Sequence, residues 1–325
     1  MESQPKQASI IMERQTLNIS IVIPTLNRIS SLKRTFSFIS KSPELPREVI
    51  VIDQSSNNIA TKVKDLCAIQ NMPVKYIYLE TPSLTRARNM GLDACENDIV
   101  LFMDDDVDIA PNTLKNLLSL FKDDSISLIG GIDGASPKKR FSPLGFLFFQ
   151  SSFFKRREGH VSKAVYGVFP QDPHEQTPTE WAMGFFFAIR KSLAKKWGMK
   201  FDENLKYYAY AEDLDFTHRY FLKSKKENLM CIISTLVTVT HNISSEYRLP
   251  QRTRTFLEIC HRRYIMSKLT NSFAENLIMI WSDIGTAIRR IIKGEPFWDV
   301  FKAIIFAIKY NRDIKNGIFH YDKFI

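Results

Sequence analysis

Cysteine is scarce in this chain of 325 residues, and long apolar runs and long basic runs are missing from it. The four cysteines, Cys67, Cys95, Cys231 and Cys260, are scattered without metal-ligand spacing, which fits reduced thiols in a cytosolic protein. No window of about 18 uncharged apolar residues occurs, which argues against a membrane-spanning helix. The first 17 residues lack the apolar core of a secretory signal peptide. We therefore expect a cytoplasmic protein.

Basic residues outnumber acidic ones, and the formal net charge is +10. This balance favours anionic partners such as nucleotide diphosphates and anionic lipid head groups. Because no basic tail is present, we expect no nucleic-acid partner. The chain is long enough for one large domain or two fused halves with a sizeable core.

Apolar runs of strand length alternate with segments of helical periodicity in the first third of the chain. Such alternation predicts βαβ units, and so an α/β fold with a mostly parallel central sheet flanked by helices. Ligands on these sheets bind outside the carboxyl ends of the strands. The predicted strands are 19–23, 48–53, 74–79 and 99–103, and the predicted helices include 59–69 and 85–95.

The remainder of the chain is less regular until its C-terminal part. Residues 134–178 have no clear period, and we expect a long loop there. Further predicted elements are strands at 128–131 and 231–240 and helices at 190–197, 211–224, 251–269, 273–293 and 297–311.

Three consecutive carboxylates, Asp104, Asp105 and Asp106, end the predicted strand 99–103. Three like charges at the end of a buried strand are costly unless a positive group lies there. Oxygen ligands suit Mg²⁺ or Mn²⁺, and Mg²⁺ is usually held by one or two carboxylates together with substrate phosphates. The triplet therefore indicates a metal and a phosphorylated donor. The alternative is an acidic turn whose last Asp caps a helix near Pro111-Asn112.

Other polar residues also follow predicted strands. Pro24-Thr25-Leu26-Asn27-Arg28 comes after the first strand, where the alternative is a simple turn. Asp53 ends the second strand and either accepts hydrogen bonds from a nucleotide or caps a helix. Arg86 and Arg88, at the start of the next helix, either neutralise a diphosphate or lie on a solvated face.

A second acidic cluster, Glu212-Asp213-Leu214-Asp215, begins a predicted helix. Carboxylates at a helix N-terminus are favoured by the helix dipole, which is the structural alternative. The functional interpretation is that Asp213 is a general base, held in a fixed position by the start of the helix. His241 follows the predicted strand 231–240 and is either a metal or phosphate contact or a structural histidine.

These motifs, in this order, resemble family 2 glycosyltransferases with the GT-A fold. The resemblance covers roughly residues 18–245 and implies a flexible segment 1–17, a transferase domain 18–245 and a C-terminal helical region 246–325. Within the domain it implies a nucleotide-binding half, 18–106, and an acceptor half, 107–245. The residues that carry it are Ile21–Arg28, Glu48–Ser56, Ala87–Gly91, Asp98–Asp106, Trp181–Gly184, Phe201–Leu205 and Glu212–Asp215.

The resemblance also implies roles for single residues. Asp213 would be the catalytic base, and Asp104, Asp106 and His241 would bind Mg²⁺ or Mn²⁺. The implied donor-nucleotide residues are Pro24, Thr25, Asn27, Arg28, Asp53, Arg88, Asp104 and Asp105, and the implied acceptor-side residues are Trp181, Met183, Gly184 and Glu212.

Two departures from the family pattern narrow what the resemblance implies. Gln54 replaces the second Asp of the second-strand motif, which leaves the base of the nucleotide open, although a UDP-sugar is our first expectation. Gln251-Arg252-Thr253-Arg254 is followed by Thr255 and not by the Trp of processive members. We therefore expect an inverting, metal-dependent enzyme that adds one sugar to a glycan or lipid-linked acceptor in surface polysaccharide synthesis.

Two other functions stay open. A sugar-phosphate nucleotidyltransferase would share the sheet and the carboxylates, but commonly carries a Gly-rich loop after the first strand, and no Gly follows Pro24 here. A non-catalytic glycan-binding or scaffold protein with a transferase fold is the other alternative, and the intact acidic clusters argue against it.

The acceptor side and the C-terminal helices suggest a contact surface. Aromatic residues lead from Phe141 to Phe154 and into Lys155-Arg156-Arg157. Ile288, Ile291 and Ile292 lie among Arg289, Arg290 and Lys293, and Phe301, Ile304, Ile305 and Ile308 form an apolar stripe. These surfaces fit a peripheral membrane contact, a homo-oligomer interface or packing on the protein's own core.

Overall fold

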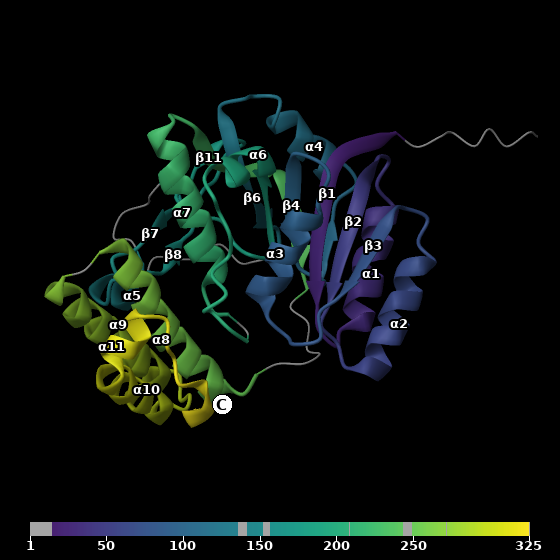
Figure 1. Cartoon of the computed structure of the whole chain (residues 1–325). Coiled ribbons are helices and arrows are strands. Elements are labelled where there is room, and N and C mark those ends of the chain that lie inside the picture. Colours follow the sequence, from purple (N-terminus) through teal and green to yellow (C-terminus); the bar gives the residue numbers. More distant parts are fainter. Residues whose placement is uncertain are drawn as a thin grey trace, which may run out of the picture.

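A computed structural model describes residues 15–135, 142–151, 157–207, 209–242, 249–270 and 272–324. Its centre is a twisted sheet with the strand order β3-β2-β1-β4-β10-β6-β11-β5, and β9 pairs with β11 (Figure 1). The first four strands in the chain, β1 (Thr16–Thr25), β2 (Leu45–Asp53), β3 (Val74–Tyr78) and β4 (Ile99–Met103), run parallel. The predicted α/β fold with a mostly parallel sheet is confirmed.

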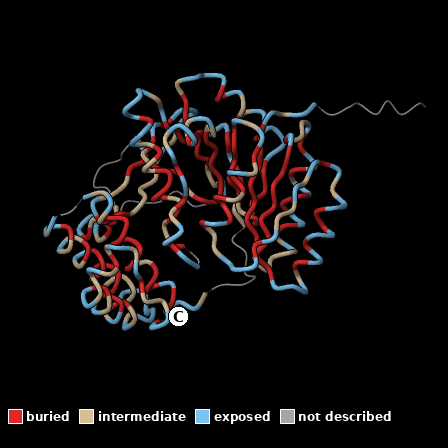
Figure 2. The backbone as a smooth tube through the Cα atoms, viewed as in Figure 1, coloured by how far each residue is buried: buried red, intermediate tan, exposed pale blue. Residues whose placement is uncertain are grey.

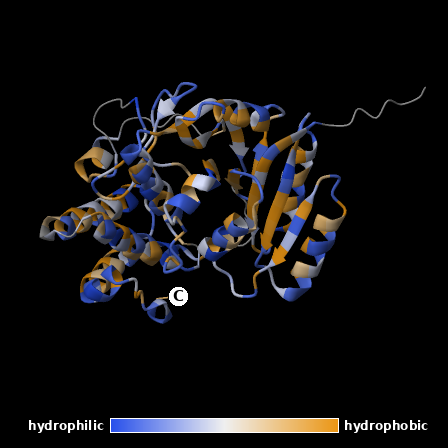
Figure 3. Ribbon diagram, turned by 45° about the horizontal axis from the view of Figure 1, so that its top comes forward, coloured by the Kyte–Doolittle hydropathy of each residue, from blue (hydrophilic) through white to orange (hydrophobic). Residues whose placement is uncertain are grey.

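The central strands are buried on both faces, which explains their uninterrupted apolar sequences (Figures 2 and 3). Along β1, Ile21 and Ile23 belong to one core, and Val22 belongs to the core on the opposite face. This alternation follows from the two-residue period of a strand.

Helices cover both faces of the sheet. The first face packs on α1 (Ile29–Ser40), α2 (Asn57–Ala68) and α4 (Thr113–Leu120). The second packs on α3 (Leu84–Ala94), α6 (Lys191–Lys196) and α7 (Glu212–Lys226). Gly91 lets α3 approach β1, because a Cβ at this position would lie 2.2 Å from a methyl carbon of Val22.

Two strands that shape the site were not predicted. β10 (Phe186–Arg190) lies between β4 and β6 (Ile126–Asp133) and is antiparallel to both. Its apolar run leads directly into α6, so no turn signal separates strand from helix. β5 (Val107–Ile109) begins one residue after the acidic triplet and pairs with the end of β11 (Met230–His241). Three residues are too few to show a period.

The segment 134–178 contains short elements. They are α5 (Pro143–Leu147), β7 (His160–Val161), β8 (Gly167–Val168) and β9 (Thr177–Pro178). Phe141, Phe153, Phe154, Lys155 and Arg156, part of the predicted contact surface, lie outside the described residues.

The C-terminal part is helical, as predicted, with α8 (Gln251–Leu269), α9 (Phe273–Ile292), α10 (Trp298–Lys309), α11 (Asn311–Lys315) and a 3₁₀ turn, η1 (Tyr321–Lys323). These helices share a core with Leu214 of α7. Arg262 and Arg263 both pair with the buried Asp283, at 3.0 and 2.7 Å. Throughout the described part of the chain, no helix is both long and apolar enough to span a membrane.

The buried His261 of α8 is expected to make folding stability depend on pH. Its ring nitrogens lie 3.3 Å from the Tyr210 carbonyl oxygen and 2.9 Å from the Tyr321 hydroxyl oxygen. Burial lowers the pKa of His261 from 6.5 to about 3. Asp202 raises this pKa and Lys268 lowers it, and both effects are smaller than that of burial. Below about pH 6.5 the unfolded chain therefore binds a proton that the folded chain does not.

This histidine should lower the free energy of unfolding by up to about 1.4 kcal/mol for each pH unit below about 6.5, or about 2 kcal/mol at pH 5. Urea unfolding at about pH 7.5 and pH 5 measures the loss. The matched variant His261→Gln should lose less over the same interval, and an equal loss in both proteins would contradict the assignment.

Candidate active site

The carboxyl ends of β1, β2 and β4 meet at one edge of the sheet, as the parallel topology requires. Thr25 pairs in register with Asp53 at the ends of β1 and β2, and the acidic triplet follows β4. The antiparallel β10 brings its preceding segment to the same edge, where the Asp104 N–H donates to the Phe185 carbonyl oxygen at 3.0 Å.

The three carboxylates of the triplet face different partners. Asp105 is buried and accepts hydrogen bonds from the Thr25 hydroxyl at 2.6 Å and from Arg28 at 3.3 Å. Burial raises the pKa of Asp105 to about 7, against the opposing effect of Arg28. Asp106 does not cap α4, whose N-cap position is Asn112, so the helix-cap alternative is wrong.

Asp104, Asp106 and His241 form a group with ligand atoms within 4.8 Å of one another. His241 comes from the end of β11, its Nε2 atom lies 3.2 Å from Asp106 Oδ1, and its ring stacks on Phe185 at 4.9 Å. Burial lowers the pKa of His241, but Asp106 and Asp104 outweigh this effect and raise it above 6.5. The two carboxylates suit Mn²⁺ or Mg²⁺, and the imidazole nitrogen is better suited to Mn²⁺, since Mg²⁺ prefers oxygen ligands, so these residues fit a divalent cation.

Arg88 connects this group to the second acidic cluster. Its guanidinium is fully buried, and donates to Asp104 at 3.0 Å, to the Gly184 carbonyl oxygen at 2.9 Å and to Glu212. Phe201 lies beneath it, 5.6 Å from the ring centroid. Burial raises the pKa of Glu212 well above its usual range, against the opposing effect of Arg88. The solvated-face alternative therefore holds for the exposed Arg86 and is wrong for Arg88.

Asp213 lies in the first turn of α7. One carboxylate oxygen accepts the Gly184 N–H at 2.6 Å, and the other accepts the Leu214 N–H at 2.8 Å. Gly184 leaves room for this contact, because a Cβ there would lie 3.0 Å from Asp213 Cβ and 3.2 Å from Arg88 Nη1. The predicted base and the predicted metal ligand Asp104 are thus linked through Arg88 and Gly184.

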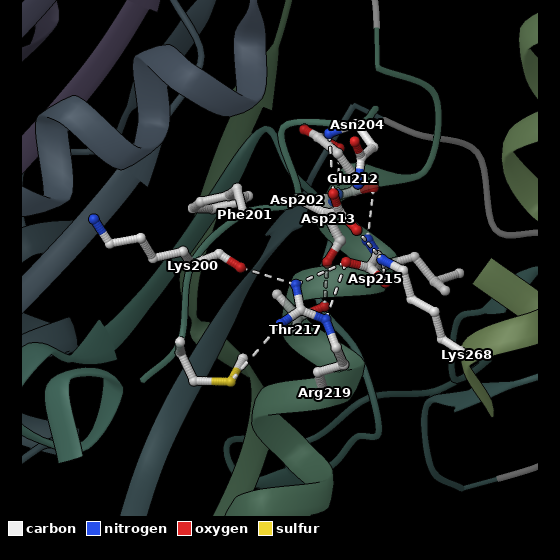
Figure 4. A network of polar contacts seen from close by, with 12 residues as sticks. Lys200, Phe201, Asp202, Asn204, Glu212, Asp213, Asp215, Thr217, Arg219 and Lys268 are labelled. Carbon is white, nitrogen blue, oxygen red and sulfur yellow. Dashed lines mark hydrogen bonds and ion pairs between the residues drawn. The ribbon is translucent and has the colours of Figure 1, made fainter. Parts of the chain in front are cut away.

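The start of α7 is also fixed from the C-terminal part (Figure 4). Asp215 accepts hydrogen bonds from Arg219 at 2.7 Å and from Lys268 of α8 at 2.9 Å. Lys268 also pairs with Asp202, which accepts a hydrogen bond from Tyr264 at 2.7 Å. Sequence patterns did not indicate this network, since its members come from three distant segments.

The predicted donor residues on β1 and β2 have local partners. Asp53 is buried and accepts the Ser55 N–H at 2.9 Å and the Tyr76 hydroxyl at 3.0 Å. It does not cap α2, whose N-cap is Ser56, so that alternative is wrong. Asn27 has a positive φ of 54° and joins the two loops, since its Oδ1 accepts the Ser56 N–H at 3.0 Å.

Other residues of the site area were missed or placed only roughly by sequence. Tyr76 was missed because nothing in β3 marks it as a partner of Asp53. Gln54, which accepts the Ser83 N–H at 2.7 Å, fixes the start of α3. Trp181 is buried over Gly167 and donates to the Val168 carbonyl oxygen at 3.3 Å, while Met183 is half-buried. Pro24 pairs in register with Ile52 inside the sheet.

Comparison with known proteins identifies relatives of this chain. The model of Glycosyl transferase family 2 matches residues 20–198, more than half of the sequence. The uncharacterized glycosyltransferase YwdF of Bacillus subtilis is 31% identical over 31% of this chain and 37% of its own length. The pre-mycofactocin glycosyltransferase of Mycobacterium tuberculosis is 28% identical over 39% of this chain and 27% of its own length. The matches therefore span about a third of these curated relatives.

Solved structures share the fold at low sequence identity. The mannosyltransferase PcManGT of Pyrobaculum calidifontis, in complex with GDP-Man and Mn²⁺, has a TM-score of 0.54 at 12% identity and covers 94% of this chain and 84% of its own. GalNAc-T7, with UDP, GalNAc and Mn²⁺, has a TM-score of 0.56 at 18% identity and covers 94% of this chain and 57% of its own. At these identities the likeness establishes the fold.

Proposed function

Because the chain belongs to glycosyl transferase family 2, we propose that it transfers one sugar from a nucleotide-diphosphate sugar to an acceptor hydroxyl with inversion of the anomeric carbon. The observation that carries the proposal is the continuous link from Asp104 through Arg88 and Gly184 to Asp213. This link supports the proposal because it joins the proposed metal ligand Asp104 to the proposed base Asp213 through hydrogen bonds.

The donor would lie at the carboxyl ends of β1, β2 and β4. Thr25, Asp53 and Arg28 are the proposed contacts of the nucleotide, with Pro24, Asn27 and Asp105 shaping the same edge. Asp104, Asp106 and His241 would hold a divalent cation, which supplies charge neutralisation for the departing diphosphate. The neighbours of the same fold that were solved with GDP-Man or UDP and with Mn²⁺ support a nucleotide donor and a divalent cation.

Asp213 is the proposed base. It would take the proton from the acceptor hydroxyl as that oxygen attacks the anomeric carbon and the bond to the diphosphate breaks. Its two backbone hydrogen bonds hold the carboxylate in one orientation, which a base requires. Trp181, Met183, Gly184 and Glu212 are the proposed acceptor side. The acceptor would be a glycan or a lipid-linked glycan of surface polysaccharide synthesis, reached from the cytoplasm.

A screen of nucleotide-sugars tests the proposal. With Mn²⁺ present, the cognate donor should raise the melting temperature, since a ligand stabilises the state it binds. Release of the nucleoside diphosphate in the presence of an acceptor would then show transfer. Pyrophosphate release from a nucleoside triphosphate and a sugar phosphate would instead indicate a nucleotidyltransferase. Donor binding without any hydrolysis or transfer would indicate a non-catalytic protein.

Removal of divalent cations is expected to reduce transfer to background. EDTA in excess should stop product formation, because the leaving diphosphate loses its counter-charge. Added Mn²⁺ or Mg²⁺ should restore product formation. The variant Asp106→Asn should need a higher Mn²⁺ concentration for half-maximal rate. An unchanged rate in excess EDTA would contradict metal dependence and leave the family membership untouched.

A further inference from the structure

Large apolar side chains are exposed on one part of the C-terminal region. They lie on α9 and α10, and their exposed fractions run from 42% to 67%. Single exposed apolar residues are ordinary, but a contiguous group indicates a contact surface. We call this group the outer face, and it consists of Leu277, Trp281, Ile291, Ile292, Trp298, Ile305 and Ile308.

The outer face follows helical spacing on α9. Leu277, Trp281 and Ile292 recur at intervals of four and eleven residues, which places them on one side of the helix. The opposite side is buried through Met279 and Asp283, which pack toward α8. The apolar residues Leu277, Trp281 and Ile292 therefore lie on the side of α9 that faces away from the core.

On α10 the same face is mixed with lysine. Trp298, Lys302, Ile305 and Lys309 follow one another at intervals of three and four, and all are exposed. Val300, Ala303 and Ala307, on the opposite side, are buried. α10 packs on both α8 and α9, so the two helices that carry the exposed apolar residues are neighbours (Figure 1).

The outer face continues to α5. The Trp281 indole N–H donates to the Leu147 carbonyl oxygen at 2.8 Å, and the Phe148 ring lies 5.0 Å from the Trp281 ring. Phe146 and Leu147 are themselves 41% and 52% exposed. Two segments more than a hundred residues apart thus extend one apolar surface.

We propose that the outer face binds the surface of an anionic phospholipid bilayer. Lysines are depleted in the buried core of protein interfaces, whereas at a bilayer they place their stems among the apolar groups and their ammonium groups at the lipid phosphates. Trp is favoured at the same depth. Two acidic residues partly offset the positive charge of the outer face, since Asp299 lies 3.8 Å from Lys302 and Glu295 is exposed at the turn between α9 and α10. The positive charge of the outer face therefore comes mainly from Lys293 and Lys309.

Co-sedimentation of the full chain with vesicles tests this proposal without using activity. The protein should bind vesicles of phosphatidylglycerol and phosphatidylcholine in equal parts, and bind pure phosphatidylcholine weakly. Ile305→Glu should lower binding at least about tenfold, because a carboxylate replaces an inserted apolar group near anionic lipid. The matched control is Ile69→Glu. Ile69 follows α2, far from α9 and α10 (Figure 1), and its side chain is 74% exposed, so this variant should bind as the unchanged protein does.

A second variant keeps the test independent of folding. Lys293→Gln with Lys309→Gln retains the apolar residues and should lower binding to the anionic vesicles by about fivefold for each lysine, with no effect on neutral vesicles. Failure of the unchanged protein to bind anionic vesicles would overturn the proposal. So would equal losses in Ile305→Glu and Ile69→Glu. A dimer in solution that Ile305→Glu converts to a monomer would show that a second copy covers the face instead.

Discussion

Replacing Asp213 with asparagine is expected to lower turnover at least about a hundredfold, the scale of a lost general base. Asparagine has nearly the same shape and keeps an oxygen for one of the two backbone N–H groups that bond to Asp213, so the fold and donor binding should persist. What is lost is the negative charge that accepts the proton of the attacking hydroxyl. Steady-state kinetics should show a reduced kcat with a nearly unchanged KM for the donor.

Asp215 provides the contrast on the same helix. It is buried two residues further along and bonds to Arg219 and Lys268. Asp215→Asn should therefore lower the melting temperature more than Asp213→Asn does, with a smaller loss of kcat in the protein that remains folded. Near-normal turnover by Asp213→Asn would remove the assignment of the base.

Replacing Arg88 with methionine is expected to lower the free energy of unfolding by about 3–5 kcal/mol, the usual consequence of removing one member of a buried ion pair. The guanidinium is buried and is shared by Asp104, Glu212 and the Gly184 carbonyl oxygen. Without it, the buried Glu212 and the partly exposed Asp104 lose their shared counter-charge. Urea denaturation should show a lower midpoint with an unchanged slope.

Arg86→Met is the matched control, because Arg86 lies two residues away on the same helix with an exposed side chain. It should change the free energy of unfolding by less than about 0.5 kcal/mol. The double variant Arg88→Met with Glu212→Gln should recover part of the loss, since it removes one of the orphaned carboxylates. Equal effects of Arg86→Met and Arg88→Met would contradict the buried-pair account.

Periodicity predicted most elements correctly where the chain uses one pattern for long enough. The C-terminal helices begin and end within two residues of the predicted positions, since their apolar faces repeat over several turns. β5 and β10 were not predicted, because neither shows a pattern that marks it as a separate strand. One is three residues long, and the other has both faces buried and runs directly into a helix.

The site residues divide in the same way. Strand-end carboxylates such as Asp104 and Asp106 were apparent from sequence, because charges that end a buried strand need a reason. The partners of Asp105 were not apparent, because only the fold brings Thr25 and Arg28 to Asp105 and His241 to Asp106. Lys268 gave no local signal at all, although it fixes the start of the helix that carries Asp213.

The amino-acid order by itself determined the alternation of strands and helices, the edge at which the carboxylates gather and the family to which the chain belongs, because these depend on local patterns. Only the tertiary structure decided that Arg88 is buried between two acidic clusters while Arg86 is exposed, and that α9 and α10 keep an apolar side outside their own core. Burial is a property of what distant segments place around a side chain. It cannot be read from the neighbours of that side chain in sequence.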